Sequence, residues 1–235
     1  MNKNVSPFGG SASGGKKIIT IVIIVLLAVG FGYFLFKISP QKIGDNSAFN
    51  DLNLPQAKDI QEPRPVEAGD YILGNPAAAN TLVVYEDFEC PACANFSPIV
   101  LQVPSQLKDT KVIFRHYPLP QHTLAVPAAY AAEAAGLQGQ FWKYYEQLYI
   151  RQNEWNNLTD PTQKFVDIAS QVGGMNIDQF KNDMLGKKGK SKIEKDISEA
   201  MGLKIGGTPT IYFNNKLLEL GAIDKIKQQA EKLYK

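Results

Sequence analysis

The sequence predicts an α/β fold in which a block of helices interrupts one β-sheet, with a single N-terminal membrane-spanning helix ahead of the domain. Apolar runs with strand character occupy residues 81–85 and 111–117. Helical periodicity then fills residues 122–200, and strand patterns return at 210–220. The late strands must therefore pair beside the early ones to complete the sheet.

The membrane-spanning helix is predicted at residues 18–36, a run without a charged side chain. As a helix this run would be about 28 Å long, close to the thickness of the hydrocarbon core of a bilayer. A cleaved signal peptide would have a shorter apolar region followed by small residues. Because Lys37-Ile38-Ser39-Pro40 follows instead, we predict an anchor that is not cleaved.

The charges around this anchor predict its orientation. Residues 1–37 hold 4 of the 25 basic residues and no acidic residue. The positive-inside rule then places the N-terminus in the cytoplasm and the domain outside, at the cell (inner) membrane, as a single-pass protein. The rest of the chain is close to neutral, which gives no electrostatic argument for binding nucleic acid.

These features divide the chain into four predicted parts. The parts are a cytoplasmic tail at 1–17, the transmembrane anchor at 18–36, an extracytoplasmic linker at 37–69 and a globular domain at 70–235 with a helical insertion at about 122–200. The linker is rich in proline and poor in aromatic residues, so it is expected to act as a tether, although part of it could dock on the domain.

Turn and cap signals set the order of elements within the domain. Strands are expected at 71–73, 81–85, 111–117, 210–213 and 216–220, and helices from residue 90 and at 127–138, 141–150, 160–170, 176–185, 191–201 and 222–234. Pro91 suits the first turn of its helix, where a missing N–H costs nothing, and Pro98 is expected to kink that helix. Asp160 is expected to cap the helix that follows it.

The two cysteines of the chain, Cys90 and Cys93, form a C-x-x-C motif between a strand and a helix. This context is typical of the redox-active pair of a thioredoxin-like protein. A structural zinc site would need more ligands, and the chain offers only His116 and His122 besides acidic residues. An inert disulfide would close a very short loop and stabilise little.

The position of Cys90 at a helix N-terminus predicts that it is the nucleophile. The helix dipole and free N–H groups there favour the thiolate, with a pKa below about 8.5. Cys93, one turn later, is expected to be buried and to resolve the mixed disulfide. Among Glu86, Asp87 and Glu89 we expect at least two solvated charges, with Glu86 the best candidate for a proton acceptor of Cys93.

Several segments in the same order resemble the DsbA-like thiol–disulfide oxidoreductases. They are residues 84–93 (VYEDFECPAC), 114–119 (FRHYPL) with His122, 140–142 (QFW) and 206–210 (GGTPT). The resemblance covers about residues 70–235 and implies a thioredoxin fold with an α-helical insertion between its βαβ half and its β-hairpin–helix half. It also implies that Pro209 is cis and faces the cysteines, where the Thr208 backbone would pair with an extended substrate.

The predicted function is that of a membrane-tethered oxidoreductase that introduces disulfides into unfolded or reduced exported proteins. The redox pair itself would need no metal or other cofactor. By analogy with the family, a quinone-linked membrane partner would reoxidise the pair. The dipeptide Pro91-Ala92 differs from the Pro-His of the best-known periplasmic oxidases, so a reductase or isomerase stays open. A non-catalytic metal-delivery or chaperone module is the alternative from another class.

Overall fold

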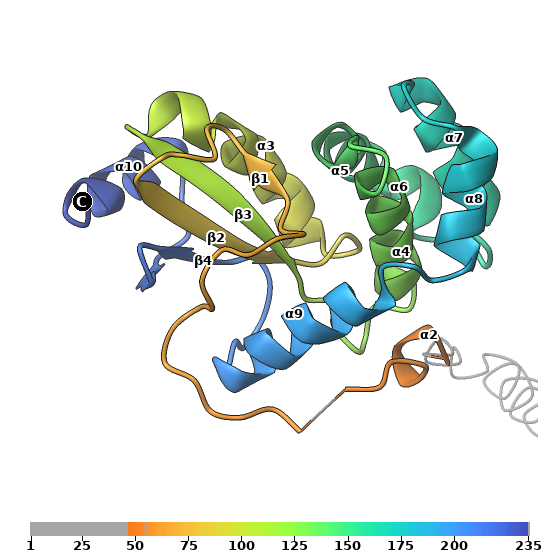
Figure 1. Ribbon diagram of the computed structural model, residues 1–235, viewed down its shortest axis with the longest axis horizontal. Coiled ribbons are helices and arrows are strands. Elements are labelled where there is room, and N and C mark those ends of the chain that lie inside the picture. The colour runs from red at the N-terminus through yellow and green to blue at the C-terminus, as the bar shows by residue number, and fades with distance from the viewer. Residues whose placement is uncertain (1–46, 55, 235) are drawn as a thin grey trace, which may run out of the picture. The chain divides into compact units, whose positions relative to one another are not determined.

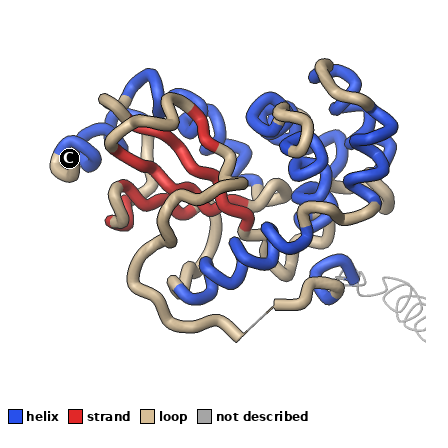
Figure 2. Tube along the Cα trace, in the orientation of Figure 1, coloured by secondary structure: helices blue, strands red, loops and turns tan. Residues whose placement is uncertain are grey.

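A five-stranded mixed sheet forms the centre of the domain in the computed structural model, which describes residues 47–54 and 56–234 (Figures 1 and 2). The strands are β1 (Ile72–Leu73), β2 (Asn80–Glu86), β3 (Thr110–His116), β4 (Thr210–Phe213) and β5 (Lys216–Leu218), in the spatial order β1-β3-β2-β4-β5. Strands β2 and β3 are parallel, and the other pairs are antiparallel. The predicted α/β fold of the domain is confirmed, because the late hairpin β4–β5 completes the sheet beside β2.

Helices cover the sheet and form a separate block at one end (Figure 1). They are α2 (Ser47–Asn50), α3 (Pro91–Gln106), α4 (Ala125–Gly136), α5 (Phe141–Ile150), α6 (Gln152–Trp155), α7 (Thr162–Val172), α8 (Ile177–Leu185), α9 (Lys190–Gly202) and α10 (Ile223–Glu231). Helix α3 runs without interruption through Pro98 and Pro104. Pro161, not the expected Asp160, occupies the N-cap position of α7. The carboxylate of Asp160 still accepts a hydrogen bond from the N–H of Thr162 at 2.9 Å and so satisfies a donor at the start of the helix.

The alternation of side chains along the central strands creates two apolar layers. Leu82 and Val84 of β2 belong to the larger core, which also holds residues of α3, α10 and the helical block. Val83 and Tyr85 belong to a second core with Ala200 of α9. The sheet is therefore covered by α3 and α10 on one face and by α9 on the other.

Aromatic rings join the helical block to the sheet. Phe114 of β3 lies 5.0 Å from Phe141 and 5.7 Å from Tyr145 of α5, measured between ring centroids. Phe88, which follows β2, stacks on Phe114 at 5.4 Å. The aromatic residues of 141–150 therefore act in packing.

The segment before β1 docks on the domain through buried charges. The N–H of Ile60 bonds to the carbonyl of Gly202 at 3.0 Å, and the guanidinium of Arg64 pairs with Asp196 and Glu199 of α9. Arg115 of β3 bonds to the same Glu199 at 2.8 Å. We call residues 56–70 the strap. Its residues 56–69 belong to the predicted linker, and the contacts of Ile60 and Arg64 fix them against α9.

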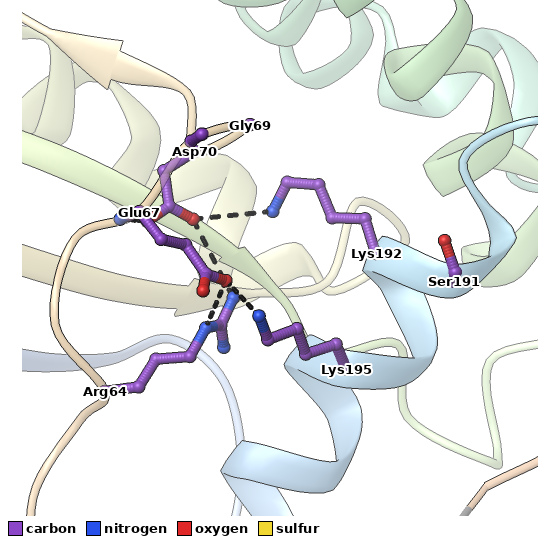
Figure 3. Close-up of a pocket in the computed structure, with 8 residues that line it drawn as sticks. Arg64, Glu67, Gly69, Asp70, Ser191, Lys192 and Lys195 are labelled. Atoms are coloured by element: carbon purple, nitrogen blue, oxygen red, sulfur yellow. Dashed lines mark hydrogen bonds and ion pairs between the residues drawn. The ribbon is translucent and has the colours of Figure 1, made fainter.

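Further charged side chains surround the guanidinium of Arg64 (Figure 3). Glu67, Asp70, Lys192 and Lys195 line a pocket of about 280 Å³ beside Arg64. Lys192 pairs with the fully buried Asp196 at 2.8 Å. The carboxylates that the strap and α9 bury are thus matched by cations, which offsets the cost of removing them from water.

The predicted anchor at 18–36 and the tail before it lie outside the described residues. Among the helices that the structure does describe, none has both the length and the apolar character needed to cross a membrane.

Replacing Arg64 with alanine should lower the free energy of unfolding by about 2 kcal/mol, because two buried carboxylates lose a cationic partner. Chemical denaturation at neutral pH measures this loss. Arg151→Ala is the matched control, since the Arg151 side chain is 17% exposed against 16% for Arg64, but its partner Glu154 is 44% exposed. The control should lose less than about 0.5 kcal/mol. Equal losses would contradict the structural role of the strap.

Candidate active site

The two cysteines lie where β2 ends and α3 begins. Cys90 occupies the N-cap position of α3, and Pro91 starts the helix. The N–H of Cys90 bonds to the carbonyl of Asp87 at 3.1 Å, which closes the turn between strand and helix. Both cysteines are free thiols; Cys90 is 7% exposed and Cys93 is fully buried. Pro91 and Ala92, between them, are exposed to solvent.

The loop before β4 faces the same point. Strand β4 is antiparallel to β2 with Tyr85 opposite Thr210, so the residues before β4 lie beside those after β2. The Thr208–Pro209 peptide bond is cis, and the Cys90 Sγ lies 3.4 Å from the carbonyl oxygen of Thr208. The structure thus brings together Cys90 and Cys93 with Thr208 and Pro209.

Hydrogen bonding strongly favours the thiolate of Cys90. The bond from the Cys93 thiol is the largest cause, aided by Thr208 and by the backbone N–H groups of Ala92 and Cys93. Together they outweigh desolvation and lower the pKa of Cys90 to about 5. The Thr208 hydroxyl is buried, and apart from its interaction with Cys90 it has no hydrogen-bond partner in the described part of the chain.

The environment of Cys93 acts in the opposite direction. Burial is the largest cause that raises the pKa of Cys93, and the bond with Cys90 and the charge of Glu86 add to it. Burial also raises the pKa of Glu86 to about 8, although the Tyr145 hydroxyl donates to its Oε2 at 2.7 Å. The Oε1 of Glu86 has no hydrogen-bond partner among the described residues. Glu86 is therefore a buried carboxylic acid at neutral pH, with an oxygen free to exchange a proton.

The acidic residues of this segment are less solvated than the sequence suggested. Glu86 and Asp87 are both 1% exposed, and Glu89 is partly buried, so the expectation of at least two solvated charges is wrong. Asp87 accepts hydrogen bonds from the N–H groups of Glu89 at 2.7 Å and Leu119 at 2.8 Å, and it contacts His122 Nδ1 at 2.7 Å. The side chain of Asp87 thus fixes two loops to each other, which the local pattern did not reveal.

Two further residues from the helical block hold the C-x-x-C turn, and the sequence analysis did not identify them in this role. The amide Nε2 of Gln152 donates to the carbonyl of Phe88 at 2.7 Å and to that of Cys90 at 3.1 Å. The hydroxyl of Tyr149 donates to the carbonyl of Asp87 at 3.2 Å. A glutamine within a helical pattern carries no signal for such a contact.

The remaining histidine is structural. His116 is 1% exposed, and its Nε2 lies 2.7 Å from Glu133 Oε1. Within residues 47–54 and 56–234, no cluster of three or more His, Cys, Asp or Glu side chains is arranged to hold a metal ion.

The domain combines a mixed sheet, a C-x-x-C motif at a helix start, a facing cis-proline and a helical insertion. These features place it in the class of thioredoxin-fold proteins. Comparison with known proteins agrees, because the family model described as Thioredoxin matches residues 67–232. The chain belongs to this family.

Solved structures place the domain among DsbA-like thiol–disulfide oxidoreductase folds. Oxidised BdbD from Bacillus subtilis is 26% identical, with a TM-score of 0.65, over 74% of this chain and 98% of that chain. DsbA from Chlamydia trachomatis shares 17% identity and a TM-score of 0.59, over 74% of this chain and 96% of that one. The second of these supports the fold alone.

Curated relatives carry a different name. The "Na(+)/H(+) antiporter NhaA 1" of Mycolicibacterium gilvum is 30% identical over 84% of this chain and 30% of that protein. The homonymous protein of Mycolicibacterium vanbaalenii is also 30% identical, over 83% of this chain and 30% of its own length. The chain thus spans under a third of the length of these curated relatives.

The pKa of Cys90 makes the stability of the reduced protein depend on pH. Because this pKa is lower in the folded reduced protein than in the unfolded chain, ionisation stabilises the reduced fold above the unfolded value and loses this effect as pH falls through about 5. As the pH falls from about 8 to about 4, the free energy of unfolding of the reduced protein should therefore decrease relative to that of the oxidised protein. Denaturation of both forms across this range measures it, and a constant difference would contradict the low pKa.

Glu86→Gln tests whether Glu86 is a buried acid, because the two proteins should differ in how their free energy of unfolding depends on pH. The pKa of Glu86 lies above its unfolded value, so its contribution to stability is present at low pH and is lost as pH rises from about 4.5 toward 8. Glutamine keeps the shape and an acceptor for Tyr145 but does not ionise. The variant should gain about 2 kcal/mol or more over the wild type as pH rises through this range. Parallel pH profiles for the two proteins would show that Glu86 is not buried as an acid.

Proposed function

We propose that this protein is a membrane-tethered, extracytoplasmic thiol–disulfide oxidoreductase that introduces disulfides into exported proteins. The redox-active group is the Cys90–Cys93 disulfide, and no other cofactor takes part. The substrates are unfolded or reduced polypeptides, and the Thr208–Pro209 loop lies where an extended chain would reach Cys90. The tether is the predicted anchor at 18–36.

The observation that carries this proposal is that the pKa values of two thiols one helical turn apart are shifted in opposite directions. The pKa of Cys90 is lowered to about 5, whereas the pKa of Cys93 is raised by burial. Cys90 lies at the N-terminus of α3 beside the cis-proline loop, whereas Cys93 is buried within the core. This asymmetry suits one sulfur for exchange with a partner and the other for resolving the intermediate.

The exchange follows from these properties. A substrate thiolate attacks the sulfur of Cys90, a substrate–Cys90 disulfide forms, and the Cys90–Cys93 bond breaks. The electron pair leaves on Cys93, whose high pKa makes it take a proton, and Glu86 is a nearby acid that can supply one. The second substrate thiolate then attacks the substrate sulfur and releases Cys90 as a thiolate. The substrate dithiol has lost two electrons and two protons.

The direction of electron flow follows from the stability of that thiolate. A low pKa makes Cys90 a good leaving group and stabilises the reduced pair, so the disulfide is a strong oxidant. This supports an oxidase over a reductase of the same fold. A membrane partner, linked to quinones by analogy with the family, would then remove the electrons.

Single cysteine variants test the roles of the two sulfurs. Cys90→Ser should abolish oxidation of reduced, unfolded ribonuclease A, because the sulfur beside the cis-proline loop that forms the mixed disulfide is lost. Cys93→Ser should react with glutathione disulfide and hold the mixed disulfide on Cys90, because Cys93 no longer resolves it. Mass spectrometry identifies the adduct. Activity that survives in Cys90→Ser would refute the catalytic proposal and favour a binding module.

The equilibrium with glutathione separates an oxidase from a reductase. An oxidase should stay largely reduced in a buffer in which glutathione and its disulfide are at the poise of an oxidising compartment. A reductase of the same fold would be largely oxidised there. Wild-type protein quenched with acid and alkylated reports the ratio directly.

A further inference from the structure

His122 is a titratable side chain beside the redox pair that the proposed exchange does not use. Its Nδ1 lies 2.7 Å from Asp87 Oδ2, and its side chain is 21% exposed while that of Asp87 is fully buried. Asp87 also accepts the N–H of Glu89 through its other oxygen, and its backbone carbonyl accepts the N–H of Cys90. His122 is thus joined through one residue to the turn that carries the reactive sulfur.

The bond to Asp87 determines which nitrogen of His122 titrates. The Asp87 carboxylate lies among donors, with the N–H of Leu119 at 2.8 Å on the same oxygen that contacts His122. A carboxylate in this position accepts a hydrogen bond, so Nδ1 of His122 is assigned as protonated. The proton that His122 gains or loses is therefore carried by Nε2, on the partly exposed side chain.

Three charged groups act on His122, and one of them changes with the redox state. The hydrogen bond to Asp87 is the largest cause that raises the pKa of His122, desolvation opposes it, and the charges of Asp87, Glu89 and Cys90 add to the rise. Asp87 and Glu89 keep the same covalent form in both redox states. Cys90 is uncharged in the disulfide and is a thiolate at neutral pH when reduced.

We propose that His122 is a redox-linked proton site that takes up a proton when the Cys90–Cys93 disulfide is reduced. The substrate dithiol gives up two electrons and two protons. The electrons break the disulfide and one proton binds Cys93. The second proton is taken up in part by Nε2 of His122, in the pH range where this residue titrates, and the rest is released to solvent. The resulting imidazolium offsets the charge of Asp87 and so supports the Cys90 thiolate. Reoxidation of the pair releases the proton again.

This inference rests on the proposed function in one respect, because it requires a disulfide that forms and breaks reversibly. Glu86 also senses the charge of Cys90, so total proton uptake alone would not identify His122. The measurement must therefore follow His122 itself.

The test is an NMR titration of the histidine rings in the full chain, in its oxidised form and after reduction with dithiothreitol. His122 should bind its proton more tightly in the reduced protein, by roughly twofold or more in affinity. The other histidine, His116, is bonded to Glu133 and serves as an internal reference for general structural change.

His122→Gln tests the effect on the thiolate, because its amide can still donate to Asp87 but does not ionise. The pKa of Cys90 is followed by thiolate absorbance over a pH range in which the wild-type His122 is protonated. It should be higher in this variant than in the wild type. Gln121→Ala, an exposed change in the same loop, should leave the pKa of Cys90 as in the wild type.

Equal proton affinities of His122 in the two redox states would overturn the inference while leaving the oxidoreductase proposal intact. A wild-type protein that forms no reversible Cys90–Cys93 disulfide would refute both. The wild-type titration gives this answer even if His122→Gln folds poorly.

Discussion

The antiparallel pairing of β2 with β4 is the constraint on which the rest of the site depends. Because Tyr85 lies opposite Thr210, the residues that leave β2 and those that enter β4 meet at one edge of the sheet. Helix α3 begins at that edge, so its free N–H groups and the Thr208–Pro209 loop converge on one sulfur. The contact joins residues 118 positions apart, and the aromatic packing of the inserted helices offsets the entropy of closing so long a loop.

One helical turn separates two opposite electrostatic environments. At the helix start, hydrogen bonds reach Cys90 and hold its charge. At Cys93, three residues further along, the effect of burial outweighs that of a hydrogen bond from the Asp87 backbone. Cys93 and Glu86 are both buried there; burial raises the pKa of each, and the charge of Glu86 raises the pKa of Cys93 further. The difference in proton affinity between the sulfurs therefore arises from position along one helix, rather than from unusual chemistry of either side chain.

Local pattern was sufficient for the strands, the cysteines and the helical insertion, but not for the buried charges. The alternation in 81–85 and the apolar spacing of the helices are properties of neighbouring residues. The observed elements therefore agree with the predicted ones apart from small differences in their boundaries. Asp87 is buried and Arg64 is partly buried because partners far along the chain, such as Leu119 and Asp196, satisfy them. Gln152 bonds two carbonyls of the C-x-x-C turn for the same non-local reason. No window of sequence contains such pairs, so a pattern can only assign these residues to the surface.

The dipeptide between the cysteines contributes little to the environment of the Cys90 sulfur. Pro91 and Ala92 are exposed, and their part in holding the Cys90 thiolate comes from a backbone N–H of Ala92. Any residue with an N–H at that position supplies the same donor. The thiolate is held mainly by Cys93 and Thr208, and Asp87 places His122 next to the turn from a different loop. The groups that surround Cys90 and its turn thus lie in three segments, which meet only in the folded protein: residues 87–93, the Thr208–Pro209 loop and the loop that contains His122. A comparison limited to the motif would miss two of the three.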